Sequence, residues 1–139
     1  MKQKNKNQKT VLIPHVSSFM KFLGIDHGDK RIGIAVSDET MTFAFPRVVL
    51  HNTKTIFKEI KKICGDENIA KIVVGMPISF SGGKSAQAEK VERFGEELEM
   101  FLSIPVEYEN EIFTTKIGRD DASAAALILQ GYLDRLHKR

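Results

Sequence analysis

The chain has 139 residues, of which 42% are hydrophobic and 28% charged, as is ordinary for one soluble globular domain. No apolar run approaches the roughly 20 residues of a membrane span, and the single cysteine, Cys64, excludes an internal disulfide and a cysteine-based zinc site. The net charge is +3, but residues 1–19 contain four lysines and no acid, so residues 20–139 carry −1. We therefore expect a cytoplasmic protein in which any basic binding surface is a local patch.

The first ten residues, MKQKNKNQKT, are polar, lysine-rich and low in complexity. This composition predicts a disordered basic extension over residues 1–19. A solubilising segment and a nucleic-acid-binding arm are both compatible with it. Met20 directly precedes the first predicted strand, so we expect residues 20–139 to form the domain and residues 1–19 to be dispensable for folding.

Three short strands are predicted first. The first covers about residues 21–26 and is followed by a turn in which Gly28 is expected to supply a positive φ. In the second strand, larger apolar residues alternate with small ones that would let another element approach one face closely. These are Ile32, Ile34 and Val36, and Gly33, Ala35 and Ser37. The third strand, about residues 42–50, contains Pro46, which favours an edge position, so the three strands predict an antiparallel meander.

Helices and strands alternate in the remainder. Apolar stripes at helical spacing predict helices within residues 53–64, with Gly65 as the stop, over about 85–102 and over about 120–136. The stripes are Ile56, Phe57, Ile60, Ile63 and Cys64; Ala88, Val91, Phe94, Leu98 and Phe101 or Leu102; and Ala125, Ile128, Leu129, Tyr132 and Leu133. A short apolar strand at 71–75 and a fifth strand at 104–111 lie between them. This order predicts an α/β fold with a mixed sheet and helices on both faces.

Three carboxylates stand at the ends of predicted elements. Asp26 ends the first strand, Glu111 ends the fifth, and Asp121 lies in the first turn of the last helix. Ligands in open α/β sheets gather at the carboxyl ends of the parallel strands, where these residues would converge if the first and fifth strands were neighbours. Converging carboxylates repel and need a compensating charge. Two Mg²⁺ or Mn²⁺ ions would supply it and would support phosphodiester hydrolysis.

Each acid also has a structural explanation. Asp26 precedes a glycine turn and suits a turn former. Asp121 suits the positive end of a helix dipole, with Asp120 as the capping residue. Glu111 follows two other glutamates on its strand, as in an exposed acidic face. Spacing and composition leave both sets of roles open.

Three blocks of the sequence resemble the YqgF family, also called RuvX, which has an RNase H-like fold. They are LGIDHGDKRIGIAVSD at 23–38, IVVGMPISFSGGKSAQA at 72–88 and DASAAALILQGYLD at 121–134, and the likeness extends over about 20–136. The resemblance implies a five-stranded mixed sheet of order 3-2-1-4-5 and a metal-dependent nuclease that uses two Mg²⁺ or Mn²⁺ ions. It implies trimming of the 5′ end of the small-subunit rRNA precursor, or resolution of four-way DNA junctions.

The resemblance also assigns residues. Asp26, Glu111 and Asp121 would be the catalytic and metal-binding acids. Nucleic acid, as an RNA precursor or a branched DNA, would be bound by Lys30, Arg31, Lys84, Thr114 and Thr115. For Lys30 and Arg31, a position on a solvent-exposed hairpin without any role in binding is an equally good explanation. A monomer or a homodimer is compatible with these roles, although resolving a junction would require two sites.

The fifth-strand block departs from the family. Its usual Asp-Glu-Arg-Leu-Thr-Thr segment is here Asn110, Glu111, Ile112, Phe113, Thr114 and Thr115. Only ten positions separate Glu111 from Asp121, where the family has a further helix and a lysine-rich loop. A degenerate homologue that binds RNA without cutting it is therefore an alternative. Sugar-kinase and actin-like ATPases are another, but they need two such domains to enclose a nucleotide.

Overall fold

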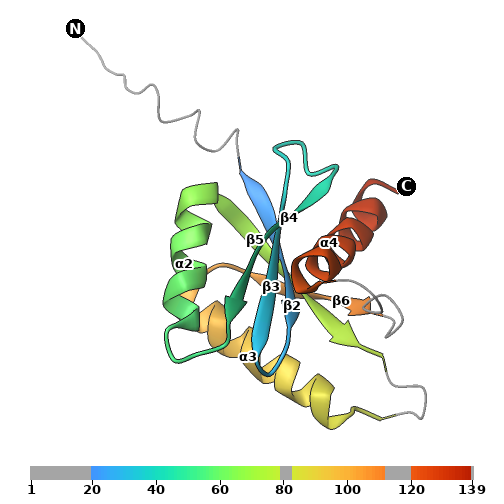
Figure 1. The fold of residues 1–139 in the computed structure, drawn as a ribbon. Coiled ribbons are helices and arrows are strands. Elements are labelled where there is room, and N and C mark those ends of the chain that lie inside the picture. Colours follow the sequence, from blue (N-terminus) through green and yellow to red (C-terminus); the bar gives the residue numbers. More distant parts are fainter. Residues whose placement is uncertain (1–19, 79–82, 112–119, 139) are drawn as a thin grey trace, which may run out of the picture.

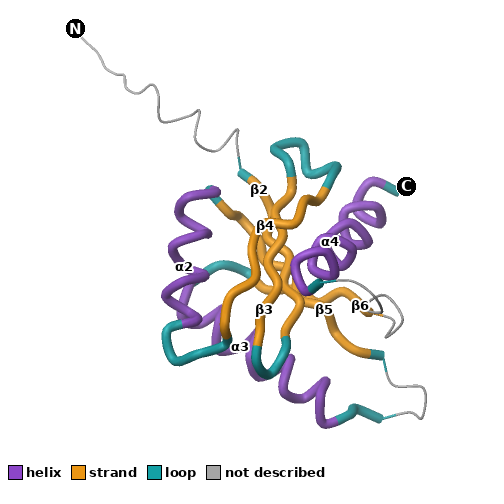
Figure 2. Tube along the Cα trace, viewed as in Figure 1, coloured by secondary structure: helices purple, strands orange, loops and turns teal. Residues whose placement is uncertain are grey.

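A five-stranded mixed sheet forms the centre of the fold (Figures 1 and 2). The computed structural model describes residues 20–78, 83–111 and 120–138, so the predicted extension 1–19 lies outside the described residues. The strands are β2 (Lys21–His27), β3 (Arg31–Ser37), β4 (Ala44–His51), β5 (Ile69–Pro77) and β6 (Val106–Glu111). Their order in the sheet is β4-β3-β2-β5-β6, which confirms the predicted 3-2-1-4-5 arrangement.

The pairing directions are also as predicted. β2, β3 and β4 form an antiparallel meander, whereas β5 runs parallel to both β2 and β6. β4 is an edge strand, and its register against β3 shifts between Ile34 and Ala35, next to the position that pairs with Pro46. A proline is tolerated there because an edge strand needs fewer backbone donors.

Helices cover both faces of the sheet (Figure 1). Helices α2 (Ile56–Glu67) and α3 (Ala86–Leu102) pack with Ile25, Ile34 and neighbouring apolar residues in one core cluster. Helix α4 (Asp121–His137) packs with Val73 and other residues on the opposite face. None of the helices in the described part of the chain has the length and apolarity that crossing a membrane requires.

Most of the predicted helix contacts are confirmed. The α3 and α4 stripes are buried, apart from Phe101, which is 45% exposed, while Leu102 packs against the core. Asp120 caps α4, as predicted, by accepting a hydrogen bond from the Ser123 N–H at 2.7 Å. Cys64 is buried in the core, and this burial raises the pKa of its thiol to about 12.

The predicted stop of the first helix at Gly65 is wrong. α2 continues to Glu67 and ends at Asn68, which takes the left-handed conformation with φ 57°. Its N–H bonds to the Cys64 carbonyl, and β5 begins at the next residue. Asparagine tolerates this conformation better than most side chains, so the glycine was not needed as the cap.

Two details of the first hairpins also differ from the prediction. Gly28 does not have a positive φ; a Cβ there would instead lie 2.6 Å from the Arg31 carbonyl oxygen, so glycine is required by a close backbone approach. β4 begins two residues later than predicted. The N–H groups of Thr42 and Phe43 bond to Asp38 Oδ1 and are therefore not available to β3.

Glu67, at the end of α2, links the helix to two strands. Its carboxylate accepts hydrogen bonds from Lys21 Nζ and Arg47 Nε, each at 2.8 Å. The bonds from Lys21 and then Arg47 hold the pKa of Glu67 below its usual value. We expect Glu67→Gln to lower the free energy of unfolding by about 1 kcal/mol at neutral pH.

The stabilisation by Glu67 should depend on pH. A lowered folded-state pKa stabilises the fold above the unfolded value of 4.5, and this stability is lost as the pH falls through the folded pKa. Urea unfolding should therefore show a lower free energy of unfolding for Glu67→Gln than for the wild type near neutral pH, and equal values for the two proteins in acid. Asp66→Asn, which alters an exposed i,i+4 pair with Lys62, is the control. Equal stabilities of Glu67→Gln and the wild type at neutral pH would contradict the assignment.

Candidate active site

Asp26 lies near the carboxyl end of β2, in the middle of the sheet, and is only 2% exposed. Side chains alternate between the faces of a strand. Gly24, two residues earlier, faces α4, because a Cβ there would lie 2.7 Å from the Cβ of Leu129. Asp26 therefore points to the α4 face of the sheet, where a buried carboxylate needs a compensating polar or cationic group.

Glu111, the last residue of β6, reaches the same face and is 8% exposed. Its Oε1 lies 2.6 Å from the position that a Cβ on Gly75 would take. The first and fifth strands are not the neighbours that the sequence argument supposed, because β5 lies between β2 and β6. Ile25 pairs with Val74, and the next residues of the two parallel strands, Asp26 and Gly75, therefore lie near each other at the carboxyl ends of β2 and β5. The missing side chain of Gly75 thus leaves room for the Glu111 carboxylate to extend over β5 toward Asp26.

Asp121 reaches this end of the sheet because α4 begins directly over β3. A Cβ on Gly33 would lie 1.9 Å from the Asp121 carbonyl oxygen, and Gly33 pairs with Asp26 across the antiparallel ladder. The expectation that the small residues of this strand admit another element is therefore confirmed. The Asp121 carboxylate accepts a hydrogen bond from Arg31 Nε at 3.0 Å.

The three predicted acids lie on one face of the sheet, at the end where the parallel strands finish, but they do not form a complete ligand set. Within residues 20–78, 83–111 and 120–138, no group of three or more His, Cys, Asp or Glu side chains is arranged so that it could hold a metal ion. One of the three, Asp121, is paired with a cation of the protein, Arg31. The oxygen donors themselves suit Mg²⁺ or Mn²⁺.

Three of the five predicted nucleic-acid-binding residues lie in the described part of the chain. Lys30 is exposed on the β2–β3 turn, next to Arg31. Lys84 lies just before α3 and pairs with Glu92 at 2.6 Å, a hydrogen bond that raises the pKa of the lysine. Thr114 and Thr115 lie outside the described residues.

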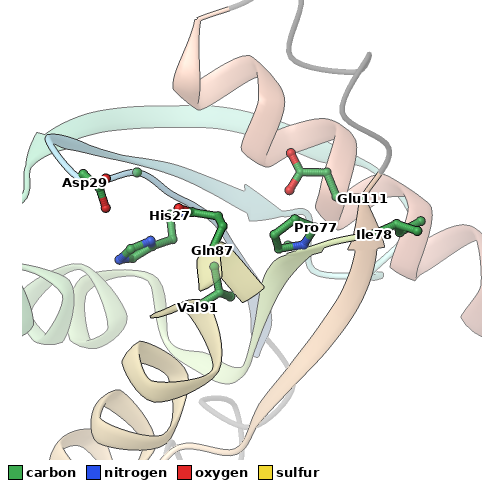
Figure 3. A pocket seen from close by; sticks show the side chains of 9 residues that line it. His27, Asp29, Pro77, Ile78, Gln87, Val91 and Glu111 are labelled. Carbon is green, nitrogen blue, oxygen red and sulfur yellow. The ribbon is translucent and has the colours of Figure 1, made fainter. Parts of the chain in front are cut away.

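A cavity of about 500 Å³ opens at the carboxyl ends of β2 and β5 and includes Glu111 in its lining. Figure 3 shows Glu111 and Pro77 on the side of the parallel strands, with Gln87 and Val91 contributed by α3. His27 also lines it and packs on Phe94, with ring centroids 4.6 Å apart. The sequence did not predict His27 or Gln87 as residues of the site. The position of His27 directly after Asp26 is the one feature of the sequence that could have indicated it.

Comparison with known proteins identifies the family. A family model described as RuvX, Holliday junction resolvase, matches residues 20–120. The chain belongs to the RuvX family. The match ends one residue before Asp121, so the RuvX match itself covers Asp26 and Glu111 but not the third acid.

Curated relatives are similar over most of the chain. A protein of Carboxydothermus hydrogenoformans is 38% identical over 133 residues, covering 83% of this chain and 96% of the relative. A protein of Bartonella bacilliformis is 32% identical over 143 residues, covering 90% and 89%. Both bear the name "Putative pre-16S rRNA nuclease". These names confirm the prediction that this RuvX chain belongs to a family of nucleases, enzymes that hydrolyse phosphodiester bonds.

Solved structures share the fold. The RuvC protein of T. thermophilus in complex with a Holliday junction substrate superposes with a TM-score of 0.55 at 13% identity, covering 85% of this chain and 96% of the other. The Fowlpox virus resolvase with Holliday junction DNA gives a TM-score of 0.51 at 14% identity, covering 86% and 100%. At these identities the similarity concerns the fold, and it confirms the RNase H-like architecture predicted for this RuvX protein.

Proposed function

We propose that this chain is a divalent-metal-dependent nuclease that hydrolyses phosphodiester bonds at the 5′ end of a 16S rRNA precursor. The observation that carries the proposal is the placement of two almost fully buried carboxylates, Asp26 and Glu111. Both lie on one face of the sheet at the carboxyl ends of their strands, where α/β folds bind their ligands. The names of its RuvX relatives support the choice of substrate.

Asp26, Glu111 and Asp121 would hold the ions. Their donor chemistry fits Mg²⁺ or Mn²⁺, and a rearrangement of their side chains would be needed to complete the ligand set. Carboxylate oxygens are the ligands that Mg²⁺ and Mn²⁺ prefer. Negatively charged carboxylates that lie close together favour a cation between them. Two such ions, when bound, would activate the attacking water and stabilise the leaving oxygen. Lys30 and Arg31, at the exposed tip of the same hairpin, would orient a backbone phosphate.

The cavity between β5 and α3 would accept the nucleotide next to the scissile bond. Its walls combine apolar side chains, such as Val91 and Ile78, with the polar Gln87 and His27. This composition suits a sugar and base whose phosphate points to the carboxylates. We infer a monomer as sufficient for cutting one RNA strand, whereas resolving a junction would require a second copy.

Cleavage of a small substrate panel tests the proposed function. The purified chain would be incubated, with Mn²⁺ or with EDTA, with single-stranded RNA that spans the mature 5′ end of 16S rRNA, with duplex RNA and with a four-way DNA junction. We expect cutting of single-stranded RNA in Mn²⁺ and none in EDTA. Preferential cutting of the junction would instead assign the activity in the RuvX family description, and RNA binding without cutting would assign the degenerate, non-catalytic role.

A further inference from the structure

Arg31 and Asp121 are ninety positions apart in the sequence and form an ion pair at the candidate active site. Arg31 lies two residues before Gly33 on β3 and therefore points to the same face. Gly33 pairs with Asp26, so the Arg31 guanidinium lies on the face that carries the carboxylates of Asp26, Glu111 and Asp121. It places one positive charge of the protein where the proposed function requires divalent ions.

We propose that Arg31 exchanges partners during the reaction cycle. In the nucleic-acid-free protein it holds the carboxylate of Asp121. When a strand arrives, Arg31 transfers to a backbone phosphate and leaves Asp121 available to a divalent ion. Arg31 is therefore a positioning residue that couples substrate binding to completion of the metal site; this inference rests on the proposed function.

The exposure of the pair makes such an exchange inexpensive. The Arg31 side chain is 57% exposed and that of Asp121 is 29% exposed. Exposed ion pairs change an equilibrium by about fivefold at most, which a phosphate or a divalent ion can readily outweigh. The backbone of Asp121 does not have to move, because it is fixed over Gly33 and by the Asp120 cap. Only the two side chains need to turn.

Guanidinium groups suit this role. Arginine presents several N–H donors in a planar fork that matches both carboxylate and phosphate geometry. Arg31 is the first residue of β3, next to the exposed turn, and donates its Nε–H to Asp121. The same side chain can therefore serve the protein's own acid first and the nucleic acid afterwards.

The first test measures binding of labelled single-stranded RNA in EDTA, so that neither metal nor cleavage contributes. We expect Asp121→Asn to tighten binding by about two- to fivefold, because it releases Arg31. Arg31→Ala should weaken binding and reduce the magnitude of the salt slope by about 1. In the Arg31→Ala background, Asp121→Asn should give no gain. An equal gain in both backgrounds would show a general charge effect and would overturn the inference.

The second test measures Mn²⁺ binding to the protein without nucleic acid, by calorimetry. We expect Arg31→Ala to bind Mn²⁺ about two- to fivefold more tightly than the wild type, because Asp121 no longer has a competing cation. Lys30→Ala removes the same charge from the neighbouring residue and should have a smaller effect. Equal effects of the two variants, or no effect of Arg31→Ala, would overturn the exchange.

The two tests separate this inference from the proposed function. A protein that cuts RNA but shows no coupling between Arg31 and Asp121 keeps the proposed function and loses the exchange. A protein that cuts nothing but shows the coupling in both measurements keeps the exchange and loses the catalytic proposal. If RNA binding in EDTA is undetectable, the Mn²⁺ measurement decides, because it needs no nucleic acid.

Discussion

Asp26→Asn is expected to reduce metal-dependent RNA cleavage by about a thousandfold or more while leaving the fold intact. Asparagine has the shape of aspartate, so it fits the nearly inaccessible site at the end of β2. It removes the negative charge that would hold the ions, and it offers an amide donor in place of a carboxylate oxygen. Single-turnover cleavage in Mn²⁺ measures the loss.

The stability of the same variant provides an independent check. Asparagine keeps the shape of aspartate, so the variant is expected to keep the fold, with a melting temperature close to that of the wild type. Asp66→Asn, at an exposed position on α2, should alter neither cleavage nor stability appreciably. Undiminished cleavage by Asp26→Asn would remove this residue from the mechanism; a much lower melting temperature would instead identify Asp26 as a structural residue.

Local patterns predicted the strands and helices that frame the site, whereas the order of the strands in the sheet came from the family resemblance. The alternation of Ile32, Gly33 and Ile34 predicts both the strand and the close approach of another element, since only the glycine face can accept one. The spacing of Leu129 and Leu133 predicts the helix face that packs there. Such patterns act over a few residues and can be recognised without knowledge of the tertiary structure.

The details that control chemistry depend on contacts between distant segments. The ion pair between Arg31 and Asp121 requires α4 to begin over β3, and no local sequence pattern predicts this contact. In the sequence Gly75 is only the last residue of a predicted strand, yet in the fold it makes room for the carboxylate of Glu111 from the next parallel strand, β6. The helix stop shows the same limit at short range, because α2 passes Gly65 and ends at Asn68, one residue before β5 begins.

Gly33→Ala is expected to damage both stability and activity, through the position of α4. The added Cβ would lie 1.9 Å from the Asp121 carbonyl oxygen and 2.9 Å from the Ala122 nitrogen, so the start of the helix must move away from the sheet. Forcing a methyl group into a packed contact costs about 1–3 kcal/mol and sometimes more, and backbone atoms yield less readily than side chains. We expect a loss of about 3 kcal/mol in urea unfolding.

The same displacement should lower cleavage, because Asp121 moves with the first turn of α4. A shift of about 1 Å in a catalytic group can cost a hundredfold in rate, and we expect a loss of this order from the folded fraction of Gly33→Ala. Gly65→Ala is the matched control. A Cβ there would meet no atom within 4 Å beyond the adjoining backbone of its own helix, and alanine in a helix should stabilise by about 0.5–1 kcal/mol without affecting cleavage. Wild-type stability and activity in Gly33→Ala would mean that α4 does not start in contact with β3, and the convergence of Asp121 with the other acids would lose its structural basis.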